Sequence, residues 1–304
     1  MTYTKDFSVI IPVWQGAIKY LPKLFDSIPD KEGIEIIVVD NSKELVSREE
    51  IKSDRDIVFL HSAPERHAGG SRNDGMAVAK GKWLIFADAD DFFAPNAFEV
   101  FYAWLNSDAE IIYTCSKGIY ADTGEPSERG KRDALKVHRF CIGEIDEISL
   151  RFGISSPCAK MVSHALVDRH NLKYDEIRAG NDIYFSLTSG YYAKKVLALE
   201  NVTYIITSNY GSLTQRRDYE VIKARLYSLL HCNQFLKKHG FSNRQYSIMN
   251  CLYEGRRYGI RKMWEFFCMV VKYRQNPFIG WKRWSKSYKN SKEIDKQNKK
   301  YIVK

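Results

Sequence analysis

The stretch that decides the fold is residues 83–91, WLIFADADD, an apolar run that ends in three carboxylates. Continuous apolar runs of this length are typical of strands buried on both faces, as in a parallel sheet. Asp88, Asp90 and Asp91 repel one another unless a cation lies between them. Oxygen ligands suit hard cations such as Mg²⁺ or Mn²⁺, and Mg²⁺ completes its shell with substrate phosphates. The stretch therefore indicates a strand that leads into a candidate metal site, and a solvated loop with helix-capping aspartates is the alternative.

Similar strands and helices alternate through the first 115 residues. Apolar runs predict the strands, and apolar residues at helical spacing predict the helices between them. Pro95 predicts the start of a further helix. The predicted strands are 7–13, 34–39, 57–60, 83–87 and 110–114, and the predicted helices are 17–28 and 69–80, the latter capped by Gly81. This order favours a mainly parallel α/β sheet, which binds ligands at the carboxyl ends of its strands.

The rest of the chain is less regular. Residues 116–150 are polar and predict an insertion or a loop-rich crossover, and residues 151–215 return to mixed helix and short strand. An amphipathic helix is predicted over 221–239, with further helix beyond 242.

The charge is unevenly distributed along the chain. The 304 residues carry a net charge of +10, but residues 256–304 hold 15 Lys and Arg against 3 Asp and Glu. That segment is therefore +12 and the preceding body is −2. The composition excludes collagen-like, disulfide-scaffold and wholly disordered classes. Because the body has no basic excess, we expect no nucleic-acid partner.

The cysteines and the first residues indicate a reducing cytoplasm. The six cysteines form no C-x-x-C pair, and we expect them to be small buried hydrophobes. The apolar run near the start is too short for a good signal peptide, and no window reaches the length of a transmembrane helix.

Two further polar groups are expected near the acidic stretch. Asp40 and Asn41 end the second strand, where a carboxylate can accept from a nucleobase or a ribose hydroxyl, with an Asx turn as the alternative. Glycines at 69, 70 and 75 let the backbone approach a ligand, and Arg72 can add a charge-assisted bond to phosphate. The pattern is neither a P-loop nor G-x-G-x-x-G.

Taken together, these pieces resemble a family 2 glycosyltransferase with the GT-A fold over residues 5–215. The resemblance rests on Val9–Pro12, Ile36–Ser42, Gly70–Gly75 and Phe86–Asp91, in that order and spacing. It implies a Rossmann-like, mostly parallel sheet flanked by helices, with a helical C-terminal extension. Residues 1–115 would form the nucleotide-sugar half and 116–215 the acceptor half of one domain. Residues 216–304 would form a basic and aromatic helical region suited to a membrane surface.

The resemblance also assigns roles to residues. Asp182, in Gly180-Asn181-Asp182, would be the general base, although Asn181 stands where Glu is common. Asp90 and Asp91 would hold Mn²⁺ or Mg²⁺, and Lys160 would line the acceptor side. The residues implied for the nucleotide sugar are Pro12, Trp14, Asp40, Asn41, Arg72, Asn73, Asp88, Ala89, Asp90, Arg216 and Arg217.

The implied activity is an inverting, metal-dependent transfer of a hexose from a UDP-sugar. UDP-glucose is the favoured donor and a β-1,3 linkage the favoured product. The implied acceptor is a lipid-diphosphate-linked sugar, such as GlcNAc-diphosphoundecaprenol in O-antigen or surface-polysaccharide synthesis. Lys and Arg interleaved with Trp and Phe after residue 256 favour a peripheral site on the anionic cytoplasmic face of a bacterial inner membrane. The alternatives are a nucleotidyltransferase acting on sugar phosphates and a non-catalytic membrane- or nucleic-acid-binding module.

Overall fold

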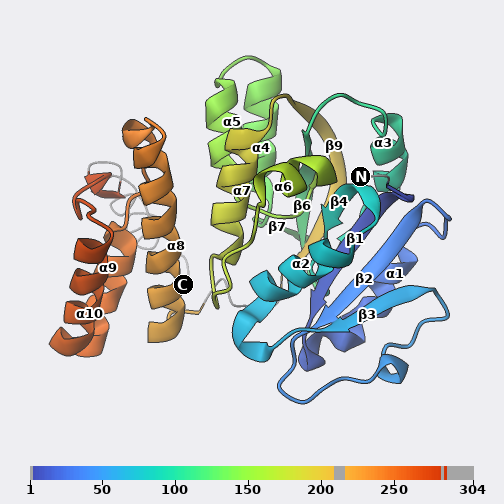
Figure 1. Ribbon diagram of the computed structural model, residues 1–304, viewed down its shortest axis with the longest axis horizontal. Helices are drawn as coiled ribbons and strands as arrows, with labels where there is room; N and C mark the ends of the chain where they lie inside the picture. Colours follow the sequence, from blue (N-terminus) through green and yellow to red (C-terminus); the bar gives the residue numbers. More distant parts are fainter. Residues whose placement is uncertain (1–2, 209–215, 282–283, 286–304) are drawn as a thin grey trace, which may run out of the picture. The chain divides into compact units, whose positions relative to one another are not determined.

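The computed structural model describes residues 3–208, 216–281 and 284–285. The chain divides into two compact units, Met1–Thr214 and Gln215–Lys304, and each is described by itself (Figure 1).

The first unit is built on a nine-stranded sheet with the order β3-β2-β1-β4-β8-β6-β9-β5, to which β7 adds by pairing with β6. Strand pairs β1–β2, β1–β4, β2–β3 and β6–β9 are parallel, whereas β8 lies antiparallel between β4 and β6. This confirms the mostly parallel α/β sheet. The strands are β1 (Lys5–Val13), β2 (Ile34–Asp40), β3 (Ile57–His61), β4 (Gly81–Phe86), β5 (Phe92–Phe93), β6 (Ile111–Tyr120), β7 (Pro126–Ser127), β8 (Lys160–Ser163) and β9 (Val196–Ser208).

Helices cover both faces of this sheet because successive side chains of a strand point to opposite faces. In β1, Val9 and Ile11 pack toward α1 (Leu21–Asp26) and α3 (Ala97–Ala103), whereas Ile10 packs toward α2 (His67–Val78). Figure 1 shows α1 and α2 on opposite faces of β1–β3. The face of α2 also carries α4 (Lys131–Cys141), α5 (Glu147–Gly153), α6 (His164–His170) and α7 (Asn181–Tyr192).

Three local predictions were wrong. Gly81 caps no helix but begins β4, where a Cβ would lie 2.4 Å from the Ser8 amide nitrogen, so the glycine permits close pairing with β1. The segment 116–150, predicted to be loop-rich, holds the end of β6, helix α4 and the first residues of α5, because Val137 and Leu150 supply buried contacts to the sheet. Among the six free cysteines, Cys141 and Cys268 are exposed.

The second unit is helical, as the sequence predicts. It contains α8 (Tyr219–Lys238), α9 (Met249–Gly255) and α10 (Gly259–Lys272). They share a core of their own, in which Leu226 of α8 packs with Phe266 and Val270 of α10. The described helices include none that is long and apolar enough to cross a bilayer. The basic residues from 286 onward, together with 282 and 283, lie outside the described residues.

The short 3-10 segments are η1 (Gln15–Tyr20), η2 (Arg48–Glu50), η3 (Pro64–Arg66), η4 (Ser242–Arg244) and η5 (Arg256–Tyr258). The predicted helix over 17–28 is therefore a 3-10 turn followed by α1.

Candidate active site

The acidic turn Asp88–Asp91 follows β4 and is held by β9. The Asp88 amide donates to the Tyr204 hydroxyl at 2.8 Å, and the Thr207 amide donates to Asp91 Oδ1 at 2.7 Å. The Thr207 hydroxyl donates to the Asp90 carbonyl. These bonds anchor the turn at both ends to a strand more than 100 residues away in sequence, which fixes the direction of its side chains.

Arg72 of α2 joins this turn to the start of α7. Its guanidinium is 4% exposed and donates to Asp88 Oδ1 at 2.5 Å and to Asn181 Oδ1 at 3.1 Å. Burial lowers the pKa of Arg72, but the Asp88 carboxylate and the weaker contributions of Tyr174, Cys158 and Asp182 together raise it above its ordinary value. The Arg72 Nε–H is buried and has no hydrogen-bond partner among the residues that the structure describes. Arg72 is therefore a permanent buried cation with an unused donor at the end of the parallel strands.

Asp182 lies beside this cation. It stands in the first turn of α7, which begins after Gly180 at a φ of +75°. Burial raises the pKa of Asp182, while the charge of Arg72 lowers it and that of Asp88 raises it again. An upward shift of its pKa makes a carboxylate a stronger base, which suits Asp182 to accept a proton.

Lys160 supplies a second buried cation whose charge acts on Asp182. The side chain is 1% exposed on β8, and Nζ donates to Ser186 Oγ at 3.0 Å. Ser186 lies one helical turn after Asp182, so the two face the same side of α7. Burial lowers the pKa of Lys160 to about 8, while Asp182 acts in the opposite direction. Asp182 thus lies among opposite charges from α2 and β8.

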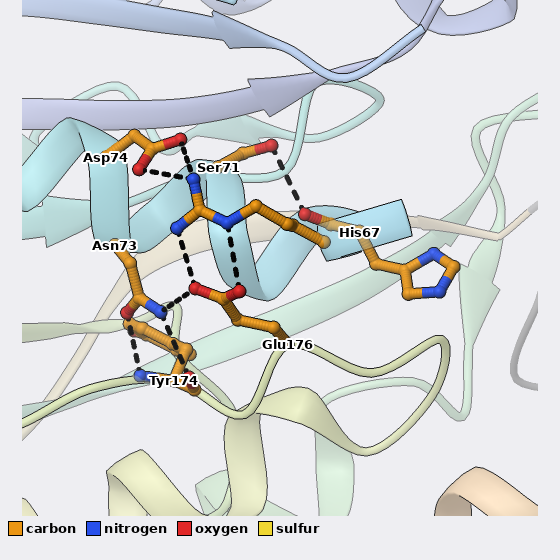
Figure 2. Close-up of polar contacts among 7 residues, drawn as sticks. His67, Ser71, Asn73, Asp74, Tyr174 and Glu176 are labelled. Atoms are coloured by element: carbon orange, nitrogen blue, oxygen red, sulfur yellow. Dashed lines mark hydrogen bonds and ion pairs between the residues drawn. The ribbon is translucent and has the colours of Figure 1, made fainter. Parts of the chain in front are cut away.

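Asn73 holds the segment that precedes α7 (Figure 2). Its amide donates to the Tyr174 carbonyl at 3.1 Å and accepts from the Tyr174 amide at 2.8 Å, and it also donates to Glu176 at 3.1 Å. Arg66 binds Glu176 through two nitrogens, at 2.7 and 2.9 Å, and binds Asp74 at 2.8 Å. The side chain predicted to lie under the nucleotide therefore ties α2 to the chain segment leading to Asp182.

Asp40 is fully buried, and its carboxylate is occupied by the loop that follows β2 and by His61 of β3. Its carboxylate accepts from the Ser42 amide at 3.0 Å, from the Val46 amide at 3.3 Å and lies 3.2 Å from His61 Nδ1. This is the geometry of the Asx-type alternative. Asn41 pairs with the Val13 carbonyl at 2.8 Å and the Ala68 amide at 3.3 Å once its amide is oriented to satisfy both.

The remaining predicted residues lie in different surroundings. Pro12 is buried in β1, Ala89 is buried in the acidic turn, and Trp14 is 62% exposed directly after β1. Arg216 and Arg217 belong to the second unit, where both are exposed. Tyr174, Glu176 and Tyr204 were missed by the sequence reasoning, because each acts through contacts more than 100 residues away.

The donor set at the acidic turn fits a hard cation. Burial raises the pKa of Asp91 well above its ordinary value, and repulsion from the Asp88 and Asp90 carboxylates raises it further, so a cation bound at this turn would offset that repulsion. Within the described part of the chain, no three or more His, Cys, Asp or Glu side chains converge as a ready metal cage. Mg²⁺ commonly uses only one or two protein carboxylates and takes its other ligands from water and a phosphorylated substrate.

The fold and the acidic turn after β4 define a GT-A glycosyltransferase architecture. The family model described as "Glycosyl transferase family 2" matches residues 8–170, more than half of the chain. The chain therefore belongs to that family.

The chain is 27% identical over 177 residues to the uncharacterized glycosyltransferase MJ1057 of Methanocaldococcus jannaschii. That alignment covers 56% of this chain, which spans only 59% of the relative's length.

Solved structures share the fold. Staphylococcus aureus TarS 1–349 in complex with UDP-GlcNAc matches with a TM-score of 0.55 and 17% identity, covering 91% of this chain and 92% of that one. The mannosyltransferase PcManGT from Pyrobaculum calidifontis, in complex with GDP-Man and Mn²⁺, matches with a TM-score of 0.55 and 12% identity, covering 92% and 84%.

Proposed function

We propose that this protein is an inverting glycosyltransferase that moves a hexosyl group from a UDP-sugar to a hydroxyl of a saccharide acceptor, with Asp182 as the general base. The observation that carries the proposal is the buried Arg72, which bonds both Asp88 after β4 and Asn181 beside Asp182. Through it, the acidic turn and the base candidate share one site at the carboxyl ends of the parallel strands, where α/β sheets bind ligands.

The roles follow from charge. The Asp182 carboxylate takes the proton of the acceptor hydroxyl as its oxygen attacks the anomeric carbon. The bond from that carbon to the diphosphate breaks, and its electron pair leaves with UDP. Attack opposite the leaving group inverts the anomeric centre. Arg72 holds Asp88 and Asn181 in place, and its spare Nε–H is a donor for an anionic ligand oxygen.

Asp90 and Asp91 are the proposed ligands of Mn²⁺ or Mg²⁺. When bound, such an ion would stabilise the negative charge that develops on the departing diphosphate. The proposal is supported by the all-oxygen donor set and by the Mn²⁺ in the fold relative PcManGT.

UDP-glucose is the favoured donor. UDP-GlcNAc is the main alternative donor, because TarS was solved in complex with it. Trp14, exposed directly after β1, is proposed to pack against the nucleobase, and its exposed ring supports that role. The residues proposed to shape the donor pocket are Pro12, Asp40, Asn41, Asn73 and Ala89. The proposed contacts of the diphosphate are Arg216 and Arg217, and Lys160 is proposed to line the acceptor side.

The proposed acceptor is a lipid-diphosphate-linked sugar such as GlcNAc-diphosphoundecaprenol, joined by a β-1,3 linkage. This would place the enzyme at the cytoplasmic face of a bacterial inner membrane. The basic and aromatic second unit supports a membrane location.

The test is a panel of UDP-glucose, UDP-galactose, UDP-GlcNAc and GDP-mannose against GlcNAc-diphospholipid analogues, with and without Mn²⁺, read by product mass. We expect Asp182→Asn to lower transfer by about 10²–10⁴-fold while UDP binding persists. Asp54→Asn, an exposed carboxylate, is the control and should transfer normally. Normal turnover by both Asp182→Asn and Asp90→Asn would refute the assigned roles, and release of pyrophosphate instead of UDP would identify a nucleotidyltransferase.

A further inference from the structure

Helix α10 has two apolar faces, and the described residues of the second unit bury one of them. Phe266 and Val270 are buried, at 0% and 4% exposure, in the core of the second unit. A second set is exposed: Ile260 (90%), Trp264 (64%), Phe267 (53%) and Val271 (57%). These four are spaced i, i+4, i+7 and i+11 and so form one line along the helix, here called the outer stripe.

Aromatic side chains in contact lie at the centre of the outer stripe. Trp264 and Phe267 stack with their ring centroids 5.3 Å apart, and the exposed Phe278 (67%) and Trp281 (46%) follow in the next segment. Among exposed apolar residues elsewhere, Leu45 lies in the loop after β2 and Leu135 lies on α4. Contiguous apolar surface of this kind marks a binding face.

The charges beside the stripe are almost all positive. Residues 256–281 hold six Lys and Arg and one acid, Glu265. That carboxylate accepts from the Tyr219 hydroxyl at 2.5 Å and pairs with Lys262 at 3.0 Å, so it is neutralised within the unit. Arg256, Arg257, Arg261, Lys272 and Arg274 are exposed. Arg261 and Lys272 lie on the same side of the stripe at 100° per residue.

We infer that the outer stripe of α10 is a membrane-docking surface, which lies in the interface of an anionic bilayer with its apolar side chains inserted and its arginines and lysines on the headgroups. Trp and Phe favour this depth, and basic residues are attracted to anionic lipid. The helix has 14 residues, too short to span a bilayer. A second copy of the chain fits less well, because a two-fold pairing of these stripes would bring the same basic residues together.

The inference deepens the proposed membrane location but does not depend on glycosyl transfer. The variants below change residues of α10 and leave the basic residues from 286 onward intact. They therefore test the contribution of α10 alone.

The experiment is flotation of the full chain with vesicles of phosphatidylcholine, alone or with phosphatidylglycerol. We expect binding to the anionic vesicles that weakens with salt. Trp264→Glu/Phe267→Glu should lower the partition coefficient at least about tenfold, because two inserted aromatics are replaced by charges that anionic lipid repels. Arg261→Gln/Lys272→Gln should lower it by about fivefold per charge, which corresponds to about 1 kcal/mol each. Leu45→Glu/Leu135→Glu is the matched control and should bind as the wild type does.

The two exposed cysteines, Cys141 and Cys268, allow an independent measurement of membrane insertion by dye fluorescence. An environment-sensitive dye on Cys268, which follows Phe267, should shift to the blue on anionic vesicles in a Cys141→Ser background. The same dye on Cys141 in a Cys268→Ser background should not shift. Equal vesicle binding by wild type and Trp264→Glu/Phe267→Glu would overturn the inference. So would a lipid-free dimer that this variant dissociates, since a second copy would then be the occupant. Both readings use no donor sugar, so failed glycosyl transfer leaves them unaffected.

Discussion

Replacing Lys160 with methionine is expected to make the protein more stable and less active. Burial holds the pKa of this lysine at about 8 instead of 10.5, and the difference corresponds to a folding cost of about 3 kcal/mol at pH 7. Methionine has a similar length and no charge. The hydrogen bond from Nζ to Ser186 is lost, which offsets about 1 kcal/mol. Ser186 keeps its donor bond to the Ser155 carbonyl at 2.8 Å. We therefore expect a gain of about 2 kcal/mol at pH 7.

The pH dependence tests the cause. The pKa is lowered in the folded state, so between about pH 8 and 10.5 the unfolded chain binds more protons and wild-type stability rises with pH. About 1 kcal/mol of the advantage of Lys160→Met should disappear between pH 7 and 9. The assay is urea unfolding of both proteins at the two pH values, with Lys52→Met, an exposed lysine, as control. A stability difference that is the same at pH 7 and 9 would refute a buried charged lysine.

Three further outcomes are expected. In Lys160→Met and in Arg72→Gln, the acid limb of the pH profile of kcat/KM should move to higher pH, because each variant loses a cation that lowers the pKa of Asp182. An acid limb that does not move would show that these cations do not set the pKa of the general base. Gly69→Ala should destabilise the first unit by about 1–3 kcal/mol in thermal unfolding, since its Cβ would lie 2.0 Å from the Asp175 carbonyl oxygen, and an unchanged Tm would contradict that packing. A chelator should abolish transfer and Mn²⁺ should restore it, whereas full turnover in the chelator would exclude the proposed ion.

The class of fold could be predicted from sequence because its signals are local. A strand buried on both faces, such as 83–86, is a short apolar run, and the parallel order follows from alternation with helices. The extent of β6 and the helices α4 and α5 were missed, since their polar residues outnumber the few apolar ones, such as Val137, that reach the sheet.

In the candidate site, too, local motifs could be predicted from the sequence, whereas contacts between distant residues could not. Asp88, Asp90, Asp91 and Arg72 were identified from motifs confined to a few residues, and Asp182 required the family resemblance. Their mutual geometry could not be read from the chain, because Arg72 meets Asp88 16 residues away and Asn181 109 residues away. Tyr204, which holds the acidic turn, carries no local signal at all.

By itself, the sequence determined what repeats at short range: which segments are strands or helices, where charge accumulates, and that α10 and its surroundings are basic and aromatic. Only the tertiary structure decided which side chains become buried partners. It turned Asp40 inward onto its own turn, set Arg72 and Lys160 as buried cations beside Asp182, and left one apolar stripe of α10 in solvent. The physical reason is that burial and pairing depend on what packs from distant segments, whereas periodicity depends only on neighbours along the chain.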